Sequence, residues 1–237
     1  MRLPLPAPTL LESWQTLWLR LQHRVRHPRH AETLIELREW YWDGAAEELS
    51  DAAARALHQD CEAAANFEAL LAMDMDSGGD QSAVAHMLAR EELSEQEIRL
   101  LRGALQSRLR IMHFEPCGEL GLQKAIDRNS GQSFWIESGS WPVPIEGHRD
   151  YLVRIVAFAS IALVAGPCFP LPSERSHPLR REAEDMLAAL MRVPGAGLRC
   201  QRESCLVDFH HQWAAERFGD LEGDVVLSPP FTLLRGA

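Results

Sequence analysis

Apolar residues recur every three or four positions through the first hundred residues, and this spacing constrains the fold more than any other feature of the sequence. The first segment follows Thr9 and Glu12, which are spaced as a capping box, where each side chain bonds a free backbone N–H of the other residue. Its large apolar residues fall on one helical face: Leu11, Trp14, Leu17, Trp18, Leu21 and Val25. We expect a helix that ends or kinks at Pro28.

The same spacing predicts further helices as far as residue 112, with a second capping box at Ser94 and Glu97. These helices are expected over about the following residues: 31–42, 50–73, 82–90 and 94–112. Since each would bury its apolar stripe against the others, residues 9–112 are predicted to form a helical bundle. The predicted core brings together one leucine from each of four helices: Leu17, Leu37, Leu57 and Leu101.

The pattern changes after residue 113. Glycines and prolines interrupt residues 114–148, where Asp127–Gly131 is typical of a turn and Phe134–Ile136 of a short strand. Residues 151–165 are almost wholly apolar. Their valines and isoleucines favour a strand, but their length and alanine content favour a helix, and we expect the helix.

Toward the C-terminus the sequence predicts two more helices, over 179–191 and 205–218, and a short strand at 198–200. The predicted fold class is therefore mainly α. An N-terminal helical bundle over 9–112 precedes a mixed α+β, glycine- and proline-interrupted half over 113–237, which can be continuous with the bundle in one globule.

Charge and composition exclude several classes of protein. The formal net charge is −10, and an acidic surface repels phosphate backbones, so a nucleic-acid partner is not expected. The longest apolar run, 155–169, is shorter than the roughly 20 residues of a membrane span. Five irregularly spaced cysteines do not suggest a disulfide framework and indicate reduced thiols in a cytoplasm. A single lysine among many arginines is typical of a GC-rich bacterial genome.

One cluster has metal-ligand chemistry. Zinc prefers thiolate and imidazole ligands, and a turn between Cys200 and Cys205 would let these two cysteines and His210 supply three of them. The fourth ligand could be His211 or a distant cysteine, Cys168 or Cys117. The fragment 198–209 resembles the first half of treble-clef-like zinc fingers that end some bacterial regulators. The second cysteine pair of those fingers is missing at 216–219, so the resemblance implies a degenerate finger. The alternative is two thiols beside an amphipathic helix, with no cofactor.

A second pattern concerns Arg108 and His113, which were predicted to lie late in a helix. Their spacing resembles the R-x4-6-H pattern of HEPN ribonucleases. That resemblance implies an arginine that steadies phosphate charge and a histidine that assists proton transfer at a 2′-hydroxyl. The position after the arginine is often polar in that family, whereas here it is Leu109. The alternative is a charged helix end whose cations complement the helix dipole.

Two further features concern loops and aromatic residues. The acidic loop 74–80 lacks the glutamate that an EF-hand needs at its twelfth position, so we expect exposed linkage there. Seven tryptophans are unusual beside two tyrosines. Since residues two apart cannot share a helical face, some of the tryptophans should be exposed, and exposed tryptophan is typical of partner-binding patches. The candidates are Trp40, Trp42, Trp135 and Trp141.

The function expected from the sequence is non-enzymatic. The chain contains no phosphate-binding loop, no dinucleotide-binding glycine pattern, no nucleophile elbow and no H-E-x-x-H motif. We expect a bacterial cytoplasmic accessory or adaptor that binds another protein. The alternative is a nucleic-acid-processing or sensing protein that uses Arg108 and His113, with or without the degenerate finger.

Overall fold

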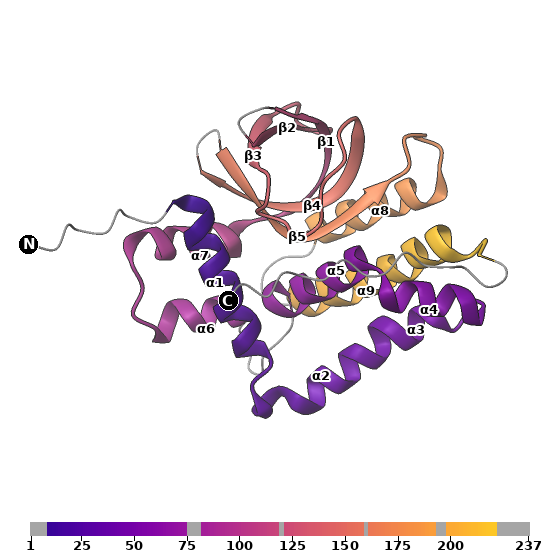
Figure 1. The fold of residues 1–237 in the computed structure, drawn as a ribbon, viewed down its shortest axis with the longest axis horizontal. Coiled ribbons are helices and arrows are strands. Elements are labelled where there is room, and N and C mark those ends of the chain that lie inside the picture. Colours follow the sequence, from indigo (N-terminus) through magenta and orange to yellow (C-terminus); the bar gives the residue numbers. More distant parts are fainter. Residues whose placement is uncertain (1–8, 75–81, 119–120, 159–160, 193–197, 222–237) are drawn as a thin grey trace, which may run out of the picture.

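The structure is a computed structural model that describes residues 9–74, 82–118, 121–158, 161–192 and 198–221. Helices come first along the chain (Figure 1): α1 (Leu10–Val25), η1 (Pro28–His30), α2 (Ala31–Arg38), η2 (Glu39–Asp43), α3 (Gly44–Ala46), α4 (Asp51–Gln59), α5 (Cys61–Met73), α6 (Ala83–Arg90) and α7 (Glu95–Gln106). Strands and two helices follow: β1 (Leu109–Cys117), β2 (Leu122–Asp127), β3 (Ser133–Glu137), β4 (Arg149–Phe158), β5 (Ile161–Leu171), α8 (Pro178–Arg192) and α9 (Leu198–Phe218).

The helix starts predicted from the caps at Thr9, Ser50 and Ser94 are confirmed. Thr9 and Glu12 form a complete capping box, in which the Glu12 carboxylate accepts from the Thr9 N–H at 2.7 Å. Ser94 and Glu97 form the second one, and Ser50 caps α4. A cap depends on residues three apart and on the orphan N–H groups of one turn, so the local sequence is sufficient to predict it.

The strands form a closed barrel in the order β1-β2-β3-β5-β4. Neighbouring strands are antiparallel except β3 and β5, which pair in parallel with Trp135 opposite Ile161. The interior is filled by Met112, Phe114, Ala125, Phe134, Ile136, Tyr151, Val153, Ile155 and other buried residues of the same cluster. The interior of a barrel with so few strands is narrow enough to be filled by its own side chains.

The predicted helix over 151–165 is wrong, because these residues belong to β4 and β5. Side chains of β4 alternate between two cores, so Val153 lies in the barrel interior while Leu152 and Val156 join the core beneath the helices. Both faces are therefore buried, and the polar alternation that identifies a half-exposed strand is absent. Figure 1 shows the barrel on one side of the helical layer, with α2 on the far side.

The predicted fold class, mainly α with a helical bundle over 9–112, is also wrong, because the second half of the chain forms a closed barrel whose first strand begins within the predicted bundle. α7 ends at Gln106, and residues 109–117, expected to finish a helix, form β1. The molecule is a mixed α/β structure in which helices cover one wall of a closed barrel. Leu109 keeps an inward position, because a strand and a helix can both place an isolated leucine against a core.

Three other helices differ from prediction. The expected helix over 50–73 divides at Asp60, whose carboxylate accepts from Ala63 N–H and begins α5. The expected helix over 31–42 changes into a π-helix, η2. Residues 198–200 lie in α9 and not in a strand.

The predicted core residues are confirmed. Leu17, Leu37, Leu57 and Leu101 are all buried within one apolar cluster that also includes β4 and β5 residues. Among the described residues, we find no helix with both the length and the apolarity that a bilayer crossing requires.

Candidate functional site

The outer surface of β2 and β3 is the part of the barrel that carries an exposed large aromatic ring. Inward positions on these strands are buried and outward ones are not, following the two-residue period of a strand. We call the outward residues the barrel face: Leu122, Lys124, Ile126, Ser133, Trp135 and Glu137. Trp135 leaves 47% of its surface exposed, between Lys124 on β2 and Ile161 on β5 in the strand register.

Charges on the barrel face are nearly balanced. The Lys124 Nζ contacts Glu115 Oε1 of β1 at 2.9 Å. Burial raises the pKa of the Glu137 carboxyl, and its Oε2 has no hydrogen-bond partner within the described part of the chain. The face is therefore an apolar centre with a mixed polar rim and no excess of positive charge, which is the composition of a protein-binding surface.

An ionic cluster lies beside this face, where β1 and β4 pair. Asp150 is buried and sits opposite His113 in the strand register. Its carboxylate accepts from Arg128 Nη2 at 2.8 Å, from Arg180 Nη1 at 2.8 Å, and lies 2.7 Å from His113 Nδ1. Burial by itself would raise the pKa of Asp150, but the hydrogen bonds from Arg128, Arg180 and His113 outweigh it and lower that pKa.

The cluster ties three parts of the fold together. Arg180 comes from α8, Arg128 from the β2–β3 turn, and Asp150 from the start of β4. The neighbouring Asp127 holds the same turn, because its Oδ1 accepts from the Asn129 and Ser130 N–H groups. The sequence did not suggest Asp150, since its partners are distant in the chain and only barrel closure brings them to it.

Arg108 and His113 are not placed as the ribonuclease resemblance requires. Arg108 is exposed immediately before β1, and His113 lies within that strand, so the late-helix setting is absent. The His113 ring faces Asp150 and Arg128. We therefore do not carry the ribonuclease roles of these residues further.

The turn needed for the predicted zinc ligands is replaced by helix. Cys205 and His210 both lie on α9, where residues five apart point in directions about 140° apart, so they cannot meet at one ion. The side chain of Cys200 lies outside the described residues. Within the described residues, no group of three or more histidine, cysteine, aspartate or glutamate side chains is arranged to hold a metal ion.

His210 instead lies at the centre of an aromatic cluster. Its ring stacks on Tyr41 of η2 with centroids 3.7 Å apart and also contacts Trp42, Phe169 and Trp213. It is fully buried, and neither ring nitrogen has a hydrogen-bond partner in the described structure. Burial lowers the pKa of His210 well below its usual value, and the neighbouring His211 lowers it further.

This arrangement predicts acid sensitivity. At pH values above about 6.5, His210 is neutral in both the folded and the unfolded chain, so it does not change the free energy of unfolding with pH there. Below that value the His210 imidazole binds a proton in the unfolded chain but stays neutral in the folded chain. The free energy of unfolding should then fall by about 1.4 kcal/mol per pH unit, until the pH reaches the lowered pKa of His210 in the folded chain.

Urea unfolding of the wild type and of His210→Leu, measured between pH 7 and pH 5, checks this expectation. The variant should lose that share of the pH dependence. His58→Leu is the matched control for the loss of a ring contact, because the His58 ring stacks on the same Trp42 but is half exposed. Equal slopes for wild type and His210→Leu would contradict the prediction.

The four candidate tryptophans fall into two groups. Trp135 and Trp40 are exposed, the latter by 38%. Trp42 is partly buried in the aromatic cluster, and Trp141 is buried in the barrel interior. Trp40 and Trp42 lie within η2, and the first is exposed while the second is partly buried, since residues two apart do not share a helical face.

The acidic loop gives a different result. Residues 75–80 lie outside the described part of the structure, but Asp74 is fully buried and pairs with Arg154 at 2.7 Å. The expectation of exposed linkage is thus wrong for Asp74. It caps the end of α5 and attaches that helix to the outer wall of β4.

Comparison of the chain with protein-family models, with curated proteins and with solved structures finds no match.

Proposed function

We propose that this chain is a non-enzymatic cytoplasmic adaptor that binds a partner protein on the barrel face, with Trp135 as the central contact. The observation that carries the proposal is the exposed Trp135 ring on a rigid sheet, between partly buried apolar neighbours and a polar rim. Tryptophans in this setting dominate binding energies at protein interfaces. The free cysteines of the described residues support a reducing compartment.

Trp135→Ala should weaken partner capture by at least about tenfold, because a central aromatic contact contributes about 2 kcal/mol or more. Wild-type and variant chains would be immobilised and exposed to lysate, and the captured proteins compared by quantitative mass spectrometry. Leu105→Ala is the matched control, since Leu105 is an exposed apolar residue of α7. An identical set of captured proteins for wild type and Trp135→Ala would contradict the proposal.

A second candidate is single-stranded nucleic acid, which the barrel itself suggests by fold analogy. Five-stranded barrels of the OB type bind oligonucleotides on the face of their second and third strands, and aromatic rings there stack on bases. Trp135 occupies the corresponding face here. The balanced local charge and the net charge of −10 favour the protein partner.

Titration of the protein with a labelled single-stranded oligonucleotide distinguishes the two functions. The adaptor proposal predicts no saturable binding at physiological salt. Binding that Trp135→Ala abolishes and Leu105→Ala preserves would replace the adaptor with a nucleic-acid-binding function.

A further inference from the structure

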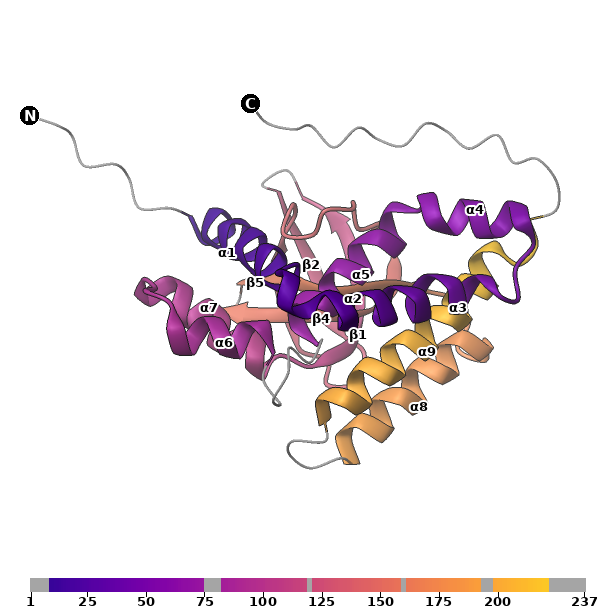
Figure 2. The same ribbon diagram turned by 90° about the horizontal axis from the view of Figure 1, so that it is seen from below.

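The two helices that meet at Pro28 carry opposite charge. Residues 9–30 contain four arginines and three histidines with a single acid, Glu12. Residues 31–51 contain seven acids and a single basic residue, Arg38. We call this region the helical corner, with α1 as its basic side and α2 to α3 as its acidic side. The junction of α1 and α2 lies away from the barrel, whereas Gln15 and Trp18 in the first half of α1 contact it (Figures 1 and 2).

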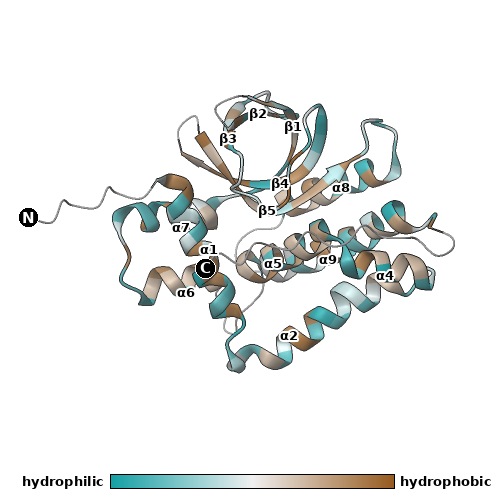
Figure 3. Cartoon of the chain, in the orientation of Figure 1, coloured by the Kyte–Doolittle hydropathy of each residue, from teal (hydrophilic) through white to brown (hydrophobic). Residues whose placement is uncertain are grey.

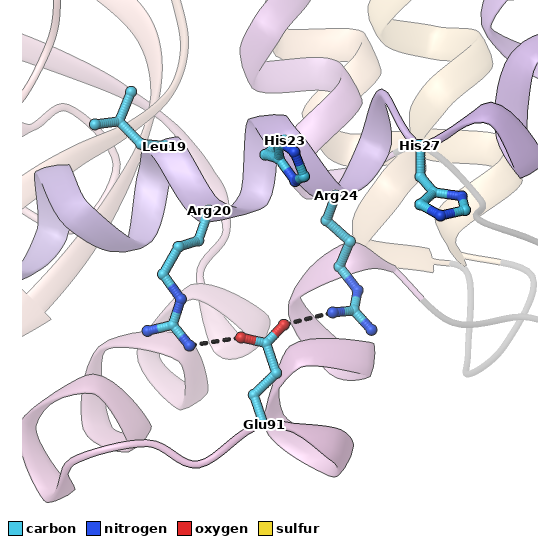
Figure 4. Close-up of a pocket in the computed structure, with 6 residues that line it drawn as sticks. All are labelled: Leu19, Arg20, His23, Arg24, His27 and Glu91. Carbon is cyan, nitrogen blue, oxygen red and sulfur yellow. Dashed lines mark hydrogen bonds and ion pairs between the residues drawn. The ribbon is translucent and has the colours of Figure 1, made fainter.

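The basic side is hollowed. A pocket of about 470 Å³ is lined by Leu19, Arg20, His23, Arg24, His27 and Glu91 (Figure 4). A second hollow of about 270 Å³ shares Leu19, His23 and His27 and continues to Pro28, so the two form one groove along α1, the α1 groove.

Side chains of the α1 groove combine an apolar contact with oriented cations. Leu19 is 66% exposed, and His23 lies one helical turn further along the same face. Glu91 Oε2 contacts Arg20 Nη2 at 2.5 Å, and its other oxygen contacts Arg24, so one carboxylate fixes both guanidinium groups. Arg20 also contacts Glu97. Arg24 Nε is buried and has no hydrogen-bond partner in the described structure, so the groove presents the two guanidinium groups through their outer nitrogens.

The acidic side presents a matching helix face. α2 buries only Leu37 of its own residues, so most of its surface is available for contact. Ile35 is 57% exposed, and the exposed acids Glu32 and Glu39 lie three residues before and four residues after it on the same face. The exposed Glu36 borders this face at the next position. Figure 3 shows hydrophilic and hydrophobic positions alternating along α2. An exposed apolar residue within an acidic ring is the complement of Leu19 within a basic groove.

We propose that two copies of this chain associate through the helical corner, with α2 of each copy in the α1 groove of the other. The groove and its complement lie on consecutive helices of one chain, so a twofold rotation joins both pairs at once. A nucleic acid would fit the α1 groove but would be repelled by α2. An unrelated acidic protein would leave α2 uncovered. A second copy covers both sides.

Sedimentation equilibrium of the full chain tests the proposal. At about 100 µM, where a contact with a micromolar Kd is largely formed, the mass should be twice the 26.7 kDa of the chain. Association should weaken between about 50 mM and about 500 mM salt, because the contact is partly ionic and exposed.

Charge reversal gives the sharper result. His23→Glu places an acid in the groove, and Glu36→Arg places a base on α2, so each variant alone should raise the dimer Kd by at least about tenfold through like-charge contact. Mixing the two variants should restore association, because each groove then meets an α2 of opposite charge. Recovery on mixing cannot arise from two misfolded chains.

Met191→Glu, at an exposed position of α8, is the control and should leave the dimer Kd unchanged. A wild-type chain that is monomeric at low salt overturns the proposal, as does a mixture that fails to recover. Binding of an acidic peptide or an oligonucleotide to a monomeric chain would assign the groove to that partner and overturn it too. Trp135→Ala should leave the dimer intact, so this test is independent of the adaptor proposal.

Discussion

Replacement of Arg154 by methionine is expected to lower the free energy of unfolding by about 3–5 kcal/mol, because it removes one charge of a fully buried ion pair and leaves the cost of burying the Asp74 carboxylate. Arg154 and Asp74 are 1% and 0% exposed, and Nη2 of the arginine lies 2.7 Å from Oδ1 of the aspartate. The pair joins the end of α5 to β4, so its loss should also weaken the attachment of the helices to the barrel.

Chemical denaturation followed by circular dichroism measures this loss. The double variant Asp74→Leu with Arg154→Met is the informative control. Two apolar residues of similar volume can replace a buried ion pair at little cost, so the double variant should regain at least half of the stability lost in the single variant. A single variant within about 1 kcal/mol of wild type would show that the pair is not buried as described.

Gly166→Ala is expected to cost about 2–5 kcal/mol, for two separate reasons. Gly166 has φ +62°, a left-handed conformation that an alanine adopts only with strain. A Cβ there would lie 2.4 Å from the Ala69 Cβ and 2.5 Å from Trp141 Cζ3, so α5 or the tryptophan must move. The glycine is therefore required for the close approach of β5 to α5.

Gly131→Ala separates the two contributions. Gly131 also has a positive φ, of 71°, but no atom lies within 4 Å of the Cβ that it would gain. This variant should show only the conformational cost, about 1 kcal/mol. Thermal or urea unfolding of both variants gives the difference, which measures the clash. Equal losses would mean that α5 and β5 adjust to the added methyl group without cost.

Local signals in this sequence predicted local structure well. The capping boxes at Thr9 and Ser94 and the leucines of the core follow from residues one or two turns apart. The sequence does not predict β4, because its pattern depends on distant segments. Leu152 packs against the helices and Val153 fills the barrel, so both faces of the strand are apolar. Alanine content then favoured the wrong element, because tertiary packing overrides helix propensity.

The candidate site was predictable to a lesser degree. Trp135 was named from its amino-acid type, and the alternating burial of β3 explains its exposure. Trp141 has the same type and is buried, so type alone does not distinguish the two. Asp150 receives Arg128 and Arg180 from distant segments, and Ile35 is exposed although other apolar residues of the helices, such as Leu37, are buried. A short stretch of sequence predicts neither the ion pairs of Asp150 nor the exposure of Ile35.

The wall formed by β4 and β5, which the barrel and the helical layer share, limits how this protein can be divided into fragments. A fragment cut to residues 109–171 would open Leu152, Val156, Leu163 and Phe169 to solvent, since these side chains point into the layer beneath the helices. Such a surface invites aggregation. The barrel is therefore not expected to fold as an autonomous unit when it is cut out or fused to another protein.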